Sequence, residues 1–395
     1  MPDTTQRNVL ILSCLIFLSL GITTAVIGPI LPELAKNNAV SLAAIGSLFT
    51  ALFMGAILAQ LVSGPLGDRV GQMPVLFGAA LLLAAGSIGF ILSRSLALTL
   101  VLVFCAGLGH GAVDLSTNVL IARVYPHRSV SALNLLNLFF GVGAFVGPAA
   151  AGFFMARMNS GLPVIWIVAG LLLLQAVFVL RIRATLPPPQ AQSGEKRPVK
   201  IYRSPLVWML GMLILLYVGT ETGIGGWVTA YMNITTAMPY ERATLIASGF
   251  WMALTIGRLA SVFLGLRLKA TRVLAISLGG SLLGGILMVA ASGDRVFTIT
   301  AVLLTGFCFG SIFPTVISLT TEAFPNSPGR AVSVVAALGS VGGMLIPWIK
   351  GLLLEQVSPL SSMLFVTSTI GLMLVVFAIV RFVPALVKLR IVTQN

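Results

Sequence analysis

The sequence predicts an all-α membrane protein with twelve transmembrane helices in two pseudo-symmetric six-helix bundles. Its composition, its long apolar segments and an internal repeat support this fold class. The 395 residues are 57% hydrophobic and only 9% charged, whereas soluble domains carry about 25% charged residues. The composition therefore excludes a soluble domain and a disordered chain. The three cysteines all lie in apolar stretches, which excludes a secreted disulfide scaffold.

Twelve apolar segments are long enough to cross a bilayer, for which a helix needs about 20 residues. The first segment is followed by Pro-Glu rather than by small residues. We therefore interpret it as a transmembrane helix and not as a cleaved signal peptide. The twelve predicted spans are 9–31, 42–64, 74–93, 97–122, 131–156, 163–182, 205–229, 243–265, 273–292, 297–320, 331–354 and 360–383.

The distribution of Lys and Arg predicts the orientation of these spans. Seventeen of these residues fall on the side of the N-terminus and six on the other side, with Arg258 inside a span. Cytoplasmic loops carry the excess of basic residues, so we expect both termini to be cytoplasmic and the protein to lie in the cell (inner) membrane. The net charge of +14 then reflects topology, and no nucleic-acid partner is expected.

The chain contains an internal repeat, and a polar linker separates the two copies. The linker, 183–204, separates a bundle at 1–182 from a bundle at 205–395. Glycines recur between the halves at an offset of about 198 residues, as in Gly21 and Gly219. Gly107 and Gly306 are a second pair. Parallel repeats of this kind meet at a midplane cavity, and rocking of one half against the other exposes that cavity alternately to each side.

The segment between predicted helices 2 and 3 reads Gly-Pro-Leu-Gly-Asp-Arg-Val-Gly. It resembles the signature loop of the major facilitator superfamily, although the residues after its last glycine are not basic. The resemblance implies that Asp68 and Arg69 help to close the cytoplasmic side. An aspartate just before helix 3 would also favour the N-terminal dipole of that helix. The alternative is a solvated tight turn. The predicted gating residues of this loop are Gly64, Gly67, Asp68, Arg69 and Gly71.

Three further stretches resemble the fucose permease-like branch of sugar:proton symporters. Helix 4 carries an acid followed four residues later by an asparagine, Asp114 and Asn118. Helix 5 carries a Leu-Asn-Leu stretch around Asn134, and helix 7 carries Glu221 and Trp227. The aspartate that fucose-type members carry in helix 1 is absent, which argues against a fucose-like substrate pose.

Asp114 and Glu221 are the two acids predicted at membrane depth. Such groups cost about 2.5–3.5 kcal/mol on insertion scales and are usually functional. His110, Asp114 and Asn118 follow one another at intervals of four residues, so they form one polar stripe. A carboxyl group in a dry cavity favours its neutral form and ionises when water enters, which predicts proton coupling through Asp114. The alternatives are a structural hydrogen bond for Asp114 and a packing role for His110.

Glu221 has two interpretations. It binds substrate or takes part in coupling, or it forms a structural hydrogen bond across the two halves. Arg258 in helix 8 is the one buried cation that the sequence suggests. It could neutralise an acid, but we favour a side chain that extends towards the cytoplasmic surface.

Amide and aromatic side chains near these acids suit a hydroxylated ligand such as a sugar or polyol. The alternative is that the aromatic rings pack between helices or anchor the protein at the interface. The predicted substrate-binding residues are Asn118, Asn134, Asn137, Tyr217, Glu221, Trp227, Trp251 and Phe313.

Charged residues after helices 4 and 10 complete the predicted gate. Arg123 occupies the position that Glu322 occupies in the second half, and Arg330 follows nearby. Opposite charges at matching positions predict salt bridges between the halves in the outward-open state, with solvated loop charges as the alternative.

These features predict a proton-coupled secondary active transporter for a small polar solute. The stretch Gly143–Pro148 resembles the antiporter motif of exporters, so proton-driven efflux of drugs, lipids or metabolites is the alternative. No metal-ligand spacing, phosphate loop or nucleophile triad indicates an enzyme. A sensor or scramblase is a further alternative. We expect a monomer in the lipid bilayer, with a small-molecule substrate and no cofactor besides the coupled proton.

Overall fold

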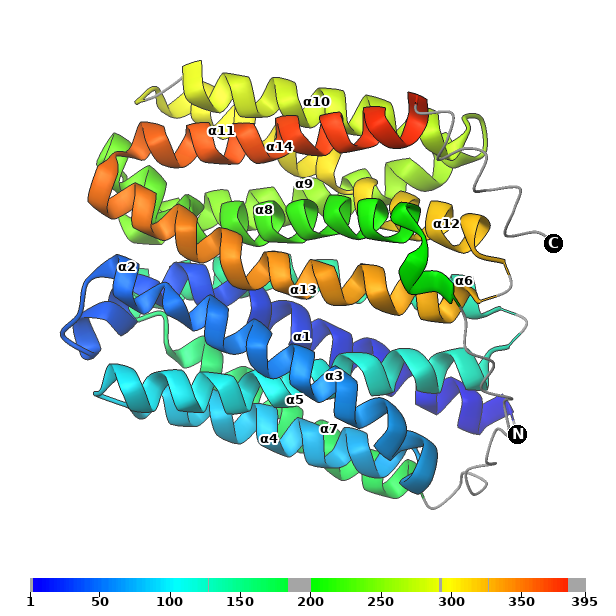
Figure 1. The fold of residues 1–395 in the computed structure, drawn as a ribbon. Helices are drawn as coiled ribbons and strands as arrows, with labels where there is room; N and C mark the ends of the chain where they lie inside the picture. Colours follow the sequence, from blue (N-terminus) through cyan, green and yellow to red (C-terminus); the bar gives the residue numbers. More distant parts are fainter. Residues whose placement is uncertain (1–2, 127, 184–199, 291–292, 326, 383–395) are drawn as a thin grey trace. The chain divides into compact units, whose positions relative to one another are not determined.

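The computed structural model describes residues 3–126, 128–183, 200–290, 293–325 and 327–382, and these residues form helices and no strand. The predicted linker falls mostly outside this range. The elements (Figure 1) are α1 (Asp3–Asn37), α2 (Leu42–Ile45), α3 (Ser47–Val70), α4 (Gln72–Leu92), α5 (Leu96–Val124), α6 (Ser129–Met158), α7 (Pro163–Arg183), η1 (Lys200–Arg203), α8 (Pro205–Thr236), α9 (Tyr240–Gly265), α10 (Ala270–Ala290), α11 (Arg295–Phe309), α12 (Ile312–Ala323), α13 (Pro328–Leu352), η2 (Leu353–Val357) and α14 (Pro359–Phe382).

The described residues contain twelve helical segments that are long and apolar enough to cross a membrane. This result confirms the twelve spans predicted from the sequence. Three of the spans join two elements each: α2 continues into α3, α11 into α12, and α13 into η2. The first and seventh spans are longer than predicted, because α1 and α8 continue as helices beyond their apolar runs.

The segment predicted as a loop between the second and third spans is almost entirely helical. Helix α3 continues to Val70 and α4 begins at Gln72, which leaves Gly71 as the turn. Gly71 has a φ of 91°, a conformation that other residues rarely adopt. Asp68 therefore lies in the last turn of α3, so the predicted interaction with the N-terminal dipole of the next helix is wrong.

The contacts divide the chain into two compact units. Unit 1 contains Met1–Gly194 and Pro239–Ser248, and unit 2 contains Glu195–Met238 and Gly249–Asn395. The division passes through α9. The beginning of this helix belongs to unit 1, where the hydroxyl of Ser248 donates a hydrogen bond of 2.7 Å to the carbonyl of Phe145 on α6.

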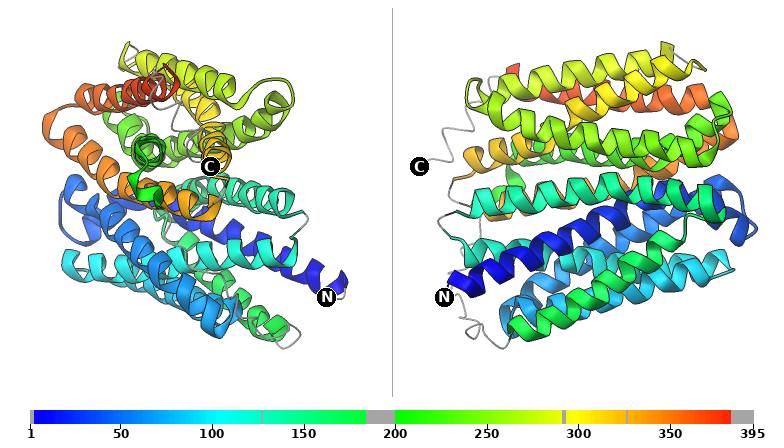
Figure 2. Two further views of the ribbon diagram at one scale, coloured as in Figure 1. Left: turned by 45° about the vertical axis from the view of Figure 1, so that its right-hand side comes forward. Right: turned by 180° about the vertical axis from the view of Figure 1, so that it is seen from behind.

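Each unit packs its helices in the same pairs. In unit 1, α1 packs on α6, and α4 packs on α5 and α7; in unit 2, α8 packs on α13, and α10 packs on α11 and α14 (Figures 1 and 2). The paired glycines make equivalent contacts, because Gly107 packs on Leu52 and Gly306 on Phe250. In the same way, Gly111 packs on Ala56 and its counterpart Gly310 packs on Leu254.

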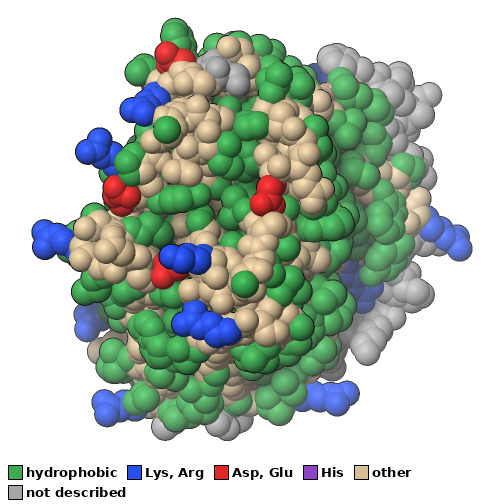
Figure 3. All heavy atoms as spheres, turned by 90° about the vertical axis from the view of Figure 1, so that its left-hand side faces the viewer, with side chains coloured by type: hydrophobic (Ala, Val, Ile, Leu, Met, Phe, Trp, Pro, Cys, Tyr) green, Lys and Arg blue, Asp and Glu red, His purple; other side chains and the backbone are tan. Residues whose placement is uncertain are grey.

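Large apolar side chains are exposed in both units. Leu61 is 65% exposed in unit 1 and Phe263 is 70% exposed in unit 2. Figure 3 shows the face at one end of the helices, where acidic and basic side chains lie among hydrophobic ones. Lipid chains are the solvent in which such apolar surface is stable, as expected for a membrane-spanning chain.

The contact between α3 and α5 makes the substitution Gly107→Ala informative. A Cβ at this position would overlap the Leu52 carbonyl, so we expect a loss of about 1–3 kcal/mol of stability from overpacking. Gly78 on α4 has open space around it, and Gly78→Ala is expected to be neutral or to stabilise by up to about 1 kcal/mol. Thermal unfolding in detergent measures both. Equal effects of the two substitutions would contradict the close approach of α3 to α5.

Candidate functional site

Asp114 lies in the middle part of α5 and is half-buried. The Asn118 side-chain amide donates one hydrogen bond to Asp114 Oδ1 at 3.0 Å and another to the Asp114 carbonyl at 2.9 Å. Within the part of the chain that the structure describes, no cation forms an ion pair with Asp114. The carboxyl group is therefore held by a neutral amide, one helical turn away.

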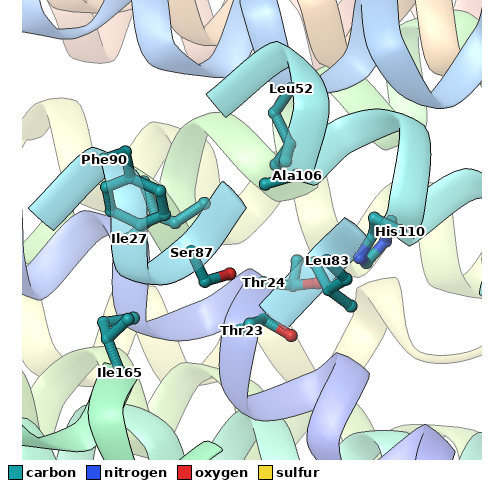
Figure 4. Close-up of a pocket in the computed structure, with 10 residues that line it drawn as sticks. All are labelled: Thr23, Thr24, Ile27, Leu52, Leu83, Ser87, Phe90, Ala106, His110 and Ile165. Carbon is teal, nitrogen blue, oxygen red and sulfur yellow. The ribbon is translucent and has the colours of Figure 1, made fainter. Parts of the chain in front are cut away.

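His110 lies one turn before Asp114 and lines a small cavity inside unit 1. Figure 4 shows its imidazole beside Thr23 and Thr24 of α1, with Ser87 of α4 nearby. The cavity volume of about 10 Å³ is enough for one water molecule. Asp114 does not line this cavity. The polar stripe of α5 thus combines a carboxyl–amide pair with a histidine that lines a cavity large enough for one water molecule.

Glu221 and Arg258 form an ion pair inside unit 2. Arg258 Nη2 lies 3.4 Å from Glu221 Oε1, and the two side chains are 20% and 10% exposed. The expectation that Arg258 extends towards the cytoplasmic surface is therefore wrong, since it serves as the counterion of a buried acid. For Glu221 the structure describes an ion pair within one unit, and the alternative of a hydrogen bond across the two halves stays a prediction. A buried carboxylate requires such a partner.

The aromatic residues predicted for the substrate site are packed in unit 2. The Tyr217 ring lies 5.4 Å from the Phe309 ring and 6.3 Å from the Phe313 ring. Trp227 contacts Gly351, and Trp251 contacts Gly225. Tyr217, Trp227 and Trp251 are all buried. They line neither the cavity beside His110 nor the cavity around Leu210 and Leu274.

The predicted amides belong to unit 1. Asn134 and Asn137 lie on α6 and are exposed, and the Asn137 amide donates to the Leu133 carbonyl at 3.0 Å. The predicted substrate-binding residues are therefore divided between the units. The structure brings Asn118 to Asp114 in unit 1 and Tyr217 to Phe313 in unit 2.

In the predicted gate, Arg123 forms its ion pair within its own unit. Arg123 Nη2 contacts Asp68 Oδ1 at 2.7 Å, so it pairs α5 with α3 in the same unit. Among the gating residues, Arg69 and Arg330 are exposed. Glu322 accepts a hydrogen bond of 3.1 Å from the Ser318 hydroxyl. In this structure Arg123 pairs with an acid of its own unit, and the salt bridges between the halves stay a prediction for the outward-open state.

Sequence reasoning missed one charged group. Lys350 lies near the end of the predicted span 331–354 and was counted among the six basic residues of the outer side, but in the structure it lies within α13, has no exposed surface and forms no hydrogen bond through Nζ among the described residues. A short apolar run, Gly351–Leu354, follows it, and the span continues to Val357. That run was the signal that would have placed this lysine inside the membrane.

Twelve spans, repeated packing in two units and buried ionisable groups define a membrane transporter. The family model of the Major Facilitator Superfamily matches residues 12–347 and 227–391, and the chain belongs to this family. Membership confirms the predicted fold and the prediction that the protein is a transporter and not an enzyme.

Known proteins of similar sequence and structure cover almost the whole chain. Protein TsgA of Shigella flexneri is 25% identical over 390 residues, which is 96% of this chain and 97% of that protein. Sodium-dependent glucose transporter 1A of Mus musculus is 22% identical over 373 residues, 85% of this chain and 87% of that protein. The crystal structure of the nucleoside transporter NupG (D323A mutant) has a TM-score of 0.77 at 12% identity and covers 94% of this chain and 98% of its own.

Proposed function

We propose that this chain is a proton-coupled secondary active transporter that moves a small polar solute, a sugar or polyol, by alternating access. The difference between Asp114 and Glu221 carries the proposal. Glu221 has an arginine partner, whereas Asp114 is held by the neutral amide of Asn118. Protonation of Asp114 therefore strands no cation, while protonation of Glu221 would leave Arg258 uncompensated.

The coupling follows from the hydration of Asp114. A buried carboxyl group favours its neutral form, and contact with water favours the ionised form. When the site opens to the side of higher proton concentration, Asp114 takes up a proton. When it opens to the other side, water enters and the proton leaves.

The substrate class rests on the residues around these acids. The amides of unit 1 and the aromatic rings of unit 2 suit a ligand with hydroxyl groups and an apolar face. The mouse relative is named as a glucose transporter, and the structural neighbour is named as a nucleoside transporter. We further propose an inner-membrane location with cytoplasmic termini, on the basic-residue count, and a monomer without a cofactor.

The stretch Gly143–Pro148, which suggested efflux, has a role in helix packing. Gly143 packs on Leu18 of α1, and its counterpart Gly342 packs on Leu215 of α8. Gly143 of the antiporter-like stretch therefore makes a helix contact that both units share. We favour uptake for this reason, and efflux is an outcome of the test below.

Reconstituted protein should concentrate a labelled sugar or polyol in vesicles that are alkaline inside, because the proton gradient supplies the driving force. A sodium gradient without a pH gradient should not support accumulation. Accumulation with sodium alone would contradict proton coupling. Extrusion of preloaded solute against its gradient, driven by a medium that is more acidic than the vesicle lumen, would instead establish efflux.

A further inference from the structure

Lys350 is a buried charge for which the proposed mechanism has no role. It has no exposed surface, and its Nζ has no hydrogen-bond partner in the described structure. Its Cδ lies 3.5 Å from the position that a Cβ on Gly223 of α8 would occupy. Trp227 lies one turn further along α8 and contacts Gly351, the residue after the lysine. The ammonium group is thus enclosed at the contact of α8 with α13.

The charges of unit 2 do not balance at this depth. Its buried acid in the described residues is Glu221, and Arg258 already pairs with it. Lys350 is therefore a second cation without a counterion from the described chain. An isolated ammonium group is strongly disfavoured in the interior of a protein, and intramembrane charges mark the paths of substrates and ions.

We propose that Lys350 binds the carboxylate of the substrate, so that the transported solute is a small hydroxylated monoanion. This inference rests on the proposed transport function and narrows its substrate class. A single lysine supplies one compact positive charge with three donors, which matches one carboxylate. Sites for phosphate dianions favour bidentate arginines, and the arginine of this unit is already paired. Trp227 provides an aromatic surface for the body of the ligand.

The enclosure of Lys350 is compatible with this role. In alternating access, a site at the contact of discontinuous or kinked helices is exposed to one side at a time. Pro347 lies within α13, one turn before the lysine, and a proline removes a backbone hydrogen bond of the helix. This weakened turn lies next to the residue that has to become accessible.

Thermal-shift measurements with matched ligands test the proposal on the full chain in detergent. The pairs are glucose and glucuronate, sorbitol and gluconate, and benzyl alcohol and benzoate, each differing by a carboxylate. We expect the anionic member of a pair to raise the melting temperature of the wild-type protein more than its neutral partner does. Lys350→Met should weaken that binding by roughly tenfold to a hundredfold, as for a hydrogen bond to a charged group. Arg272→Gln removes an exposed cation of the same unit and should leave binding unchanged.

Unfolding without ligand provides a second readout. Lys350→Met removes an unpaired buried charge and fills its space with a side chain of similar length, so it should raise the melting temperature of the ligand-free protein. A lower melting temperature would show that the lysine has a structural partner and would overturn the proposal.

Three binding results would also overturn it. They are stabilisation by neutral members alone, an anion effect that survives in Lys350→Met, and no stabilisation by any anion of the panel. The proposed function would survive each of these results if the pH gradient still drives accumulation of a neutral sugar. Failure of the proposed transport function would instead appear as a loss of proton-dependent accumulation. The binding measurements do not report accumulation, so the two failures are distinguishable.

Discussion

Asp114→Asn is expected to abolish proton-driven accumulation while substrate binding and exchange persist. Asparagine keeps the shape of the side chain and its contact with Asn118, but it cannot exchange a proton. With one proton per substrate, a gradient of one pH unit supports about a tenfold accumulation. In the variant the internal concentration should only equal the external one. Uptake of a labelled sugar into vesicles, followed by counterflow against unlabelled sugar, measures both properties.

The control for this substitution is Glu241→Gln, which removes a carboxylate from the first turn of α9, at the end of a span. It should accumulate substrate as the wild-type protein does. Normal accumulation by Asp114→Asn would show that Asp114 is not the proton carrier. Loss of both accumulation and exchange would assign Asp114 to substrate binding or folding, because a coupling residue is not required for exchange.

Arg258→Met is expected to destabilise the protein by about 3–5 kcal/mol, as when one partner of a buried ion pair is removed. The substitution leaves Glu221 as an uncompensated carboxylate, with side-chain exposure of 10%. Glu221→Gln in the same background removes the orphaned charge and should restore most of the loss. Thermal unfolding of the two single variants and the double variant gives the coupling energy through a double-mutant cycle.

Additive effects in that cycle would contradict a functional ion pair between α8 and α9. A stable Arg258→Met variant would indicate that water reaches Glu221 and replaces the arginine. In either case the reason for preferring Asp114 over Glu221 as the proton carrier would be lost, because that preference rests on the counterion of Glu221.

The sequence was sufficient for the features that depend on local pattern. Apolar runs located the twelve spans, because the bilayer requires about 20 apolar residues from each helix. Glycines at a nearly constant offset indicated the repeat, and the structure shows why: Gly107 packs on α3 and Gly306 packs on α9, at equivalent places in their units. The hydrogen bond from Asn118 to Asp114 follows from a spacing of four residues on one helix.

The contacts between helices could not be predicted from local sequence pattern. Glu221 and Arg258 are separated by 37 positions, and nothing in their spacing shows that α8 and α9 bring them together. The pairing of Asp68 with Arg123 spans 55 positions and depends on where α3 ends. Lys350 was missed because a lysine near the end of an apolar run resembles a loop residue. Its burial depends on how α13 packs on α8.

Proton binding and release by Asp114 is the step on which the proposed coupling depends most, and infrared difference spectroscopy of the reconstituted protein measures it without a substrate. Exposed carboxyl groups are ionised above roughly pH 5.5, so spectra compared between roughly pH 5.5 and 8 report buried acids. We predict a protonated-carboxyl band in the wild-type protein that grows on acidification, is lost in Asp114→Asn and persists in Glu221→Gln. A band that remains in Asp114→Asn, or disappears in Glu221→Gln instead, would contradict the central claim.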